Sequence, residues 1–462
     1  MRLRIMVRSV MFCCIAGALG CASATRRTAL PEPRSLGAEH LRSDKESPSA
    51  PDSTVGPLHE RGGTLRLDHA LAAALLHNPE LEGFAYEVRA AEAREMQARA
   101  LPNPELEIEI EEYNRDGEGF SSAETGISLG QLIELGGKRR WRTRVAQAEG
   151  RLAGWDYEAK RLDVFAETAR RFAAVVAAQR RHVLSQSSID VAERNAEAVQ
   201  ERVKAGKEPP FQAAKAGAEL EIARMEGVAA RHALAAARAN LVAMWTAPAA
   251  EFGTAEDNLD AVLDVVPSLE RLQSKLSSSP ELERWEADIE LRETALASEK
   301  AARVPDLEAS VGVHRYEEDG TDSISFGIGL PLPVFDRNRG NTSAARHELE
   351  KARSEQRAAA ASLKAQLAQA HADLASAHGR ARALALKVVP ATTEAFEAVR
   401  EGYQQGKFGF LDMLDAQRGL FEAKASLIDS LEDYHGAATA IERITATGLA
   451  TLAEEQKMED ER

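Results

Sequence analysis

The sequence predicts a mainly α-helical chain with a small β part, built as a tandem repeat in which each copy holds one β-hairpin among long helices. Short motifs recur about 200 residues apart: Asn78–Leu81 (NPEL) returns as Ser279–Leu282 (SPEL), and Ala205–Lys207 (AGK) returns as Gln405–Lys407 (QGK). The offset is 201 at the first motif and 200 at the last. One slip over so long a span indicates duplication, and duplication decides the fold.

The composition favours long helices over a bulky globular core. Only 5% of the 462 residues are aromatic, whereas 28% are charged and alanine is abundant, which is typical of long helices and coiled coils. The net charge of −15 leaves no basic stripe for nucleic acid, so we expect no nucleic-acid partner.

Residues 1–24 read as a signal peptide, because three arginines precede an apolar run at residues 10–19 that is too short to span a membrane. Ala18–Cys21 resembles a bacterial lipobox and would leave Cys21 lipidated, whereas Ala22–Ala24 offers an ordinary cleavage site. In both cases the protein leaves the cytoplasm. All three cysteines lie here, which excludes disulfides and cysteine metal sites from the body. Residues 25–63 are rich in proline, serine and charge, and we expect an extended tether.

The first repeat, 64–247, begins with a helix at about 66–100 that Asn78-Pro79 interrupts. Two strands follow, at about 103–113 and 121–133, with a turn at 114–119. In the first strand apolar residues alternate with Glu105, Glu107, Glu109 and Glu111, so the carboxylates share one face. The second repeat, 265–447, has the same design, with strands at about 304–315 and 321–334.

Each hairpin leads into a helix of unusual length, at about 138–204 and 338–404, which would extend roughly 100 Å. The first carries a coiled-coil seam with spacings of three and four residues: Leu162, Phe165, Ala169, Phe172 and Val176. Gly206 and Gly406 allow the chain to reverse, and returning helices are expected at about 211–246 and 410–447. We expect residues 448–462 to form a frayed C-terminal tail.

The hairpins point to a membrane protein made of several chains. A single hairpin is too small to be stable in water, and four strands cannot close a membrane barrel, which needs about eight. Open strand edges cannot face lipid, because each unsatisfied backbone group there costs several kcal/mol. If the strands cross a membrane, several chains must therefore combine them.

The ordered motifs resemble the TolC-like outer-membrane efflux factor family, and in particular its CzcC-type branch associated with heavy-metal efflux. The motifs that carry this resemblance are Leu67–Leu71, Asn78–Leu81, Gly136–Arg139, Leu330–Gly340 and Leu411–Gln417. The resemblance implies a homotrimer in which each chain gives four transmembrane strands to a 12-stranded β-barrel in the outer membrane. The long helices would form an α-helical tunnel in the periplasm.

In this family the duct is passive and works with a periplasmic adaptor protein and an inner-membrane pump of the resistance-nodulation-division type. The resemblance implies export of heavy-metal cations, with a drug or small-molecule efflux duct as the alternative. From other classes, a periplasmic adaptor would need lipoyl-like and additional β segments, and a structural coiled coil would not contain two lipid-compatible hairpins.

The resemblance places Asp412 and Asp415 at the periplasmic aperture, where rings of carboxylates bind hydrated cations. The alternative is that these aspartates only stabilise a helix N-terminus. The first repeat has Gln212 and Lys215 at the matching positions, and Lys215 could instead pair with an aspartate.

Three further groups of residues are candidates, each with an ordinary structural alternative. Five glutamates would face the barrel lumen, and the alternative is that they line a solvated strand face: Glu105, Glu107, Glu109, Glu111 and Glu308. The two helix tips would contact the adaptor, and the alternative is that they cap the helix pair inside the trimer: Gly206, Lys207, Gly406, Lys407, Phe408 and Phe410. The basic residues after the hairpins could contact lipid headgroups, and the alternative is that they are ordinary charges on the helix surface: Lys138, Arg139, Arg337 and Arg339.

The sequence shows no pattern for catalysis or for a cofactor. It contains no glycine-rich phosphate loop, nucleophile–base pair or zinc motif, so we predict neither an enzyme nor a resident metal. His371 and His378 lie seven residues apart on one helix, too far for one metal ion, and we expect them at the surface.

Overall fold

The computed structural model describes Pro31, Leu36 and residues 63–111, 124–256, 258–317 and 320–460. The signal peptide, Cys21, most of the tether and the turn expected at 114–119 lie outside the described residues. Within the described ranges, no helix combines the length and the apolar character needed to cross a membrane.

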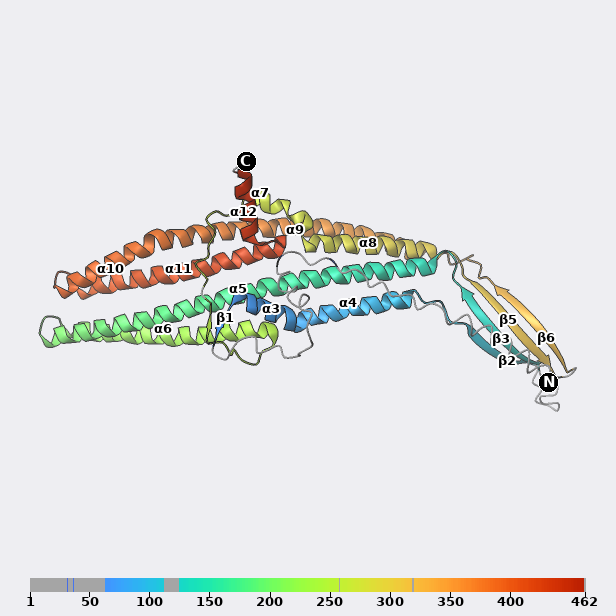
Figure 1. The fold of residues 1–462 in the computed structure, drawn as a ribbon, viewed down its shortest axis with the longest axis horizontal. Coiled ribbons are helices and arrows are strands. Elements are labelled where there is room, and N and C mark those ends of the chain that lie inside the picture. The colour runs from blue at the N-terminus through green and yellow to red at the C-terminus, as the bar shows by residue number, and fades with distance from the viewer. Residues whose placement is uncertain are drawn as a thin grey trace, which may run out of the picture.

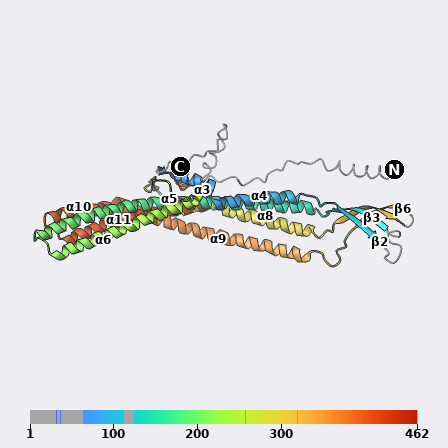
Figure 2. The same cartoon turned by 90° about the horizontal axis from the view of Figure 1, so that it is seen from below.

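Two layers of helices run along one long axis and end in a four-stranded sheet (Figure 1). The view turned by 90° shows the helix tips at one end of this axis and the strands at the other (Figure 2). The elements of the first repeat are β1 (Thr64–Leu65), α3 (Leu67–His77), α4 (Pro79–Ala98), β2 (Glu105–Glu111), β3 (Glu124–Ile133), α5 (Lys138–Lys204), α6 (Pro210–Val242) and the short 3₁₀ turn η2 (Ala243–Trp245). Those of the second are β4 (Thr254–Ala255), α7 (Leu269–Ser274), η3 (Leu276–Ser278), α8 (Pro280–Ala301), β5 (Leu307–Tyr316), β6 (Thr321–Gly329), α9 (Arg339–Ala383), the π-helical segment η4 (Leu384–Val388), α10 (Val389–Gln404), α11 (Phe410–Thr445) and α12 (Leu449–Asp460).

The four long strands form one antiparallel sheet in the order β2-β3-β5-β6, so the two hairpins lie side by side. The strands at its edges, β2 and β6, each pair on one side only among the described residues. Strand β6 ends at Gly329, earlier than the expected 334, because Pro331 and Pro333 have no N–H to give to a ladder.

The long helix of the first repeat has the bounds expected from its pattern, and its coiled-coil seam is buried in the main hydrophobic cluster. The matching helix of the second repeat runs from Arg339 to Gln404, close to the expected 338–404. It contains the π-helical segment η4, which ends two residues before Pro390. Proline cannot bond to the carbonyl four residues earlier, and a π-bulge accommodates the interruption.

Side chains of the helices hold the linker between the repeats, residues 246–268. Most of its described residues form no helix or strand. Three histidine Nε2 atoms lie within hydrogen-bond distance of its carbonyls: His435 at 2.9 Å from Leu259, His378 at 2.8 Å from Leu263 and His371 at 3.0 Å from Pro267. The expectation that His371 and His378 are surface groups is therefore corrected, since both are half-buried against the linker. Burial lowers the pKa of His435.

The C-terminal segment is a helix rather than a frayed tail. Leu449 and Leu452 of α12 are buried with α7 and the end of α11. The carboxylate of Glu442 accepts a hydrogen bond of 2.8 Å from the Leu449 N–H, which satisfies the start of α12. Burial raises the pKa of this carboxyl group. The tail prediction failed because it relied on acidic composition and ignored the leucines.

Candidate functional site

Six glutamates lie on one face of the four-stranded sheet, which we call the polar sheet face. The register places Glu105, Glu107, Glu109 and Glu111 of β2 opposite Gly130, Ser128, Gly126 and Glu124 of β3. The same register continues across β5, so Glu308 belongs to this face. The opposite face carries exposed apolar side chains: Leu106, Ile108, Ile110, Ile127, Leu129, Val311, Val313, Ile324, Phe326 and Ile328. The two faces therefore suit two different environments, one aqueous and one apolar.

His314 is the one imidazole among the described residues of the polar sheet face. Its Nδ1 lies 2.8 Å from the Glu124 carboxylate, and its Nε2 lies 2.9 Å from the Ser325 hydroxyl. Gly126 leaves room for the ring, because a Cβ there would lie 3.1 Å from His314 Nδ1. In the described part of one chain, no group of three or more His, Cys, Asp or Glu side chains is placed to hold a metal ion.

Both helix tips close with the same backbone motif. Gly206 and Gly406 adopt positive φ values of 69° and 77°. The Lys207 N–H donates to the Arg202 carbonyl at 2.9 Å, and the Lys407 N–H donates to the Gly402 carbonyl at 2.8 Å. This pattern is a Schellman motif, which satisfies the last carbonyls of each helix and needs a residue that tolerates the left-handed conformation.

The two tips share one small hydrophobic cluster that includes Val199, Tyr403, Phe410 and Met413. Phe410 is only 2% exposed, so within one chain it caps the helix pair rather than projecting outward. Phe408, Leu411 and Phe211 are exposed at the tips and remain available to a partner. The guanidinium of Arg202 lies 4.7 Å from the Tyr403 ring centre, which connects the first tip to the second. Burial raises the pKa of Tyr403.

Asp412 and Asp415 are both exposed near the start of α11. The Asp412 carboxylate accepts a 2.8 Å hydrogen bond from the Gly409 N–H, so Asp412 caps the helix that it begins. Asp415 makes no such contact with the described residues, and its negative charge acts on Arg418. Lys215 forms no ion pair with any residue in the described part of the chain.

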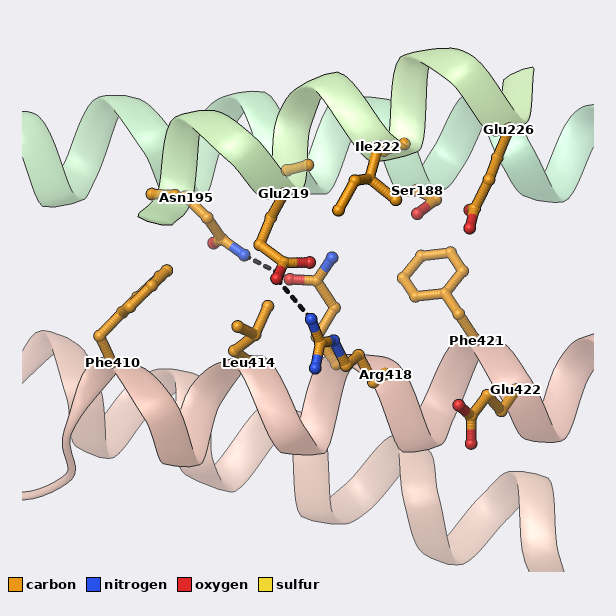
Figure 3. A pocket seen from close by; sticks show the side chains of 14 residues that line it. Ser188, Asn195, Glu219, Ile222, Glu226, Phe410, Leu414, Arg418, Phe421 and Glu422 are labelled. Carbon is orange, nitrogen blue, oxygen red and sulfur yellow. Dashed lines mark hydrogen bonds and ion pairs between the residues drawn. The ribbon is translucent and has the colours of Figure 1, made fainter. Parts of the chain in front are cut away.

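A groove of about 300 Å³ lies between α5, α6 and α11 close to the tips (Figure 3). Two polar contacts cross it and join the repeats. The Asn195 amide donates to Gln417 at 2.6 Å, and Arg418 forms an ion pair with Glu219. Phe421 and Ile222 supply apolar surface, so the groove is a partly polar contact between two helical hairpins.

At the junction between sheet and helices, Lys138 is not a free surface charge. Its Nζ lies 2.8 Å from the Asp306 carboxylate, and both side chains are 22% exposed. Arg139, Arg337 and Arg339 are exposed, as expected for residues that follow the hairpins.

Sequence reasoning grouped the glutamates of one strand correctly but did not bring Glu124 and His314 to the same face. The alternation in β5 contained that signal for His314, but the pairing between hairpins was needed to use it. The contact between Arg202 and Glu208, at 3.4 Å, was also missed. No periodic pattern indicates it, since both residues flank an irregular turn.

Comparison with known proteins agrees with this architecture. The family model described as "Outer membrane efflux protein" matches residues 70–247 and 272–447. The cobalt-zinc-cadmium resistance protein CzcC of Cupriavidus metallidurans is 37% identical over 385 residues, which cover 83% of this chain and 91% of that protein. The nickel-cobalt-cadmium resistance protein NccC of Alcaligenes xylosoxydans is 28% identical over 276 residues, covering 60% of this chain and 62% of that protein.

Solved structures share the fold at low sequence identity. A structure of CusC, reported with its transmembrane channel formation, has a TM-score of 0.72 and 17% identity, covering 85% of this chain and 95% of that chain. The open state of the MtrE outer membrane channel of Neisseria gonorrhoeae has a TM-score of 0.71 and 19% identity, covering 91% of this chain and 98% of that chain. These structures establish the fold of paired long helices that end in a four-stranded sheet.

Proposed function

Because the chain belongs to the outer membrane efflux protein family, we propose that it is the outer-membrane exit duct through which heavy-metal cations leave the cell. The duct is a homotrimer that works with a periplasmic adaptor and an inner-membrane pump. The three sheets join through their β2 and β6 edges, since each edge has hydrogen-bonding groups that one chain leaves unpaired.

The observation that carries the metal substrate is the polar sheet face. This face carries six carboxylates and one imidazole per chain. A trimer whose polar sheet faces line the passage therefore has eighteen carboxylates there. A passage lined by one sign of charge concentrates cations and excludes anions. The similarity to a protein named for cobalt, zinc and cadmium resistance favours divalent metals over organic cations.

The other candidate residues take roles in the same proposal. Asp412 and Asp415 line the periplasmic entrance, where a second ring of carboxylates meets cations arriving from the pump. The tip residues Lys207, Lys407 and Phe408 contact the adaptor, because they are exposed at the turns that end the two helix pairs. Cys21 carries the lipid that holds the N-terminus at the membrane.

The test is a resistance assay in a strain that lacks the gene, complemented with variants. We expect deletion to lower the minimal inhibitory concentrations of Zn²⁺, Co²⁺, Cd²⁺ or Cu²⁺, and the wild-type gene to restore them. The triple variant E107Q/E109Q/E111Q should restore resistance only in part, because it removes nine charges from the passage of a trimer. Outer-membrane amounts of each variant are compared by immunoblot.

The matched control is the triple variant E82Q/E270Q/E454Q, which neutralises three exposed glutamates that lie on the helices. It should restore resistance fully. Unchanged resistance to all four metals after deletion would reject the metal substrate, and a loss of antibiotic resistance alone would identify a drug duct instead. Equal behaviour of the two triple variants would reject a role for the polar sheet face.

A further inference from the structure

Five exposed arginines without an acidic partner gather where the sheet meets the helices. We call this group the junction arginines: Arg139, Arg140, Arg303, Arg337 and Arg339. None of them forms an ion pair with a residue in the described part of the chain, although Arg337 donates a 3.2 Å hydrogen bond to the Pro333 carbonyl. Elsewhere most arginines are engaged, as in the pairs of Arg151 with Glu290 and Arg181 with Asp429. In a chain of net charge −15, such a group is unusual.

The junction arginines lie at one level of the molecule. Strand β3 ends at Ile133 just before α5, α8 ends at Ala301 just before β5, and β6 ends at Gly329 just before α9. All of these crossings occur at the same end of the sheet (Figure 1). Along the long axis, the arginines therefore lie in one band between the ends of the strands and the ends of the helices.

Three acidic groups at this level are already occupied. Glu134 forms an ion pair with Arg142, and Asp306 forms one with Lys138. The Asp336 carboxylate accepts a 2.9 Å hydrogen bond from the Asn338 N–H. Glu105 and Glu308 also lie at this end, on the polar sheet face, and neither forms an ion pair with a junction arginine in the described part of the chain.

Apolar side chains lie beside these charges. Phe335 is fully exposed, and Leu332, Val334 and Leu101 are 75%, 58% and 66% exposed. Through Leu330 they continue the exposed apolar face of the sheet toward the helices. An apolar band that ends in a row of cations matches the boundary between acyl chains and headgroups in a bilayer.

We propose that the junction arginines bind anionic phospholipid headgroups of the leaflet that faces the periplasm. The planar guanidinium group makes paired hydrogen bonds to phosphate oxygens. A headgroup with net negative charge would be the anionic partner of these arginines. The periplasmic leaflet is assigned because the junction lies on the helix side of the sheet and not on the side of the hairpin turns. The inference rests on the placement of the sheet in the outer membrane, not on the metal substrate.

The test measures which lipids stay bound to the intact trimer. Full-length protein is placed in nanodiscs of equal phosphatidylglycerol and phosphatidylethanolamine, released in the mass spectrometer, and the ratio of the two retained lipids is recorded. We expect wild type to retain phosphatidylglycerol preferentially. The variant R337Q/R339Q should lower this preference by up to about fivefold for each arginine removed.

The control variant R194Q/R231Q removes two exposed arginines on α5 and α6, away from the sheet, and should leave the lipid ratio unchanged. The variant R337K/R339K keeps the charge and should retain an intermediate preference. The same spectrum reports whether each variant is trimeric, and R139Q/R140Q replaces R337Q/R339Q if that variant does not assemble. The proposal is overturned if wild type shows no preference, or if junction and control variants behave alike. A change in ion selectivity with an unchanged lipid ratio would place the arginines in the passage and would also overturn it.

Discussion

At the first helix tip an ion pair joins Arg202 to Glu208, whereas at the second tip the equivalent positions carry Gly402 and Phe408 in close contact. The Phe408 ring lies so near the Gly402 backbone that a Cβ added there would overlap its Cδ2 atom. Both tips nevertheless retain the glycine-based Schellman motif. The backbone turn was thus preserved after duplication, while the side chains that fill it diverged from a charged pair to an apolar contact.

The two tips contact each other through unlike groups. Arg202 donates a 3.2 Å hydrogen bond to the Tyr403 carbonyl and stacks over the Tyr403 ring. Position 402 instead faces Phe408 of its own turn, where a residue without a side chain leaves room for the ring. The first tip therefore supplies the cation of the contact between the repeats, and the second supplies the carbonyl and the aromatic ring.

The largest effect is expected from Arg202→Ala, because it removes the side chain that joins the two tips. The Glu208 carboxylate, 11% exposed, would lose its cation, and the Tyr403 carbonyl would lose its donor. We expect the local free energy of opening at the tips to fall by about 2 kcal/mol. Hydrogen exchange of the amides at the ends of α5 and α10 measures this quantity.

The control for that measurement is Arg224→Ala, which removes an exposed arginine of α6 that bridges Glu193 of α5 and Glu221 of α6. Its exchange rates should change much less, since exposed ion pairs contribute little. If Arg224→Ala and Arg202→Ala accelerate exchange equally, the connection between the tips has no special role.

A smaller effect, with a change of sign, is expected at the second tip. Gly402→Ala adds a Cβ that must displace the Phe408 ring, which opposes the gain in helix propensity of about 1 kcal/mol. In a Phe408→Ala background the obstruction is absent, and Gly402→Ala should stabilise the end of α10 by about 1 kcal/mol. A double-mutant cycle followed by hydrogen exchange isolates this coupling. Additive effects of the two changes would show that the ring does not press on Gly402.

How far the sequence could predict this molecule differs between its regions. The bounds of α5 and the alternation in β2 follow from local periodicity, so the residues alone indicate them. The sequence around the π-helical segment and around α12 contains conflicting local signals. Tertiary packing decides which conformation forms there. Pro390 was visible in the sequence, but a kink, a break and a π-bulge are all responses to a proline.

The candidate site follows the same division. The glutamates of β2 could be assigned to one face because they lie on one strand, whereas His314 and Glu124 come together only through the pairing of β3 with β5. Likewise, no pattern in the sequence shows that three histidines of α9 and α11 hold the linker carbonyls. Contacts to irregular backbone have no period, and only the folded arrangement reveals them.

The smallest effect on stability concerns Asp412, and it separates two roles that the sequence left open. The first tip has Gln212 at the equivalent position, so Asp412→Gln makes the second tip resemble the first. Loss of the hydrogen bond to the Gly409 N–H should destabilise the start of α11 by about 0.5–1 kcal/mol, measured by hydrogen exchange. Asp415→Gln should leave exchange there unchanged, because Asp415 caps nothing in the described part of the chain. In planar bilayers, both variants should weaken block by divalent cations if both carboxylates line the entrance. If Asp415→Gln leaves the block unchanged while Asp412→Gln changes only the exchange rates, the aspartates act as helix-start residues and the entrance is not a carboxylate ring.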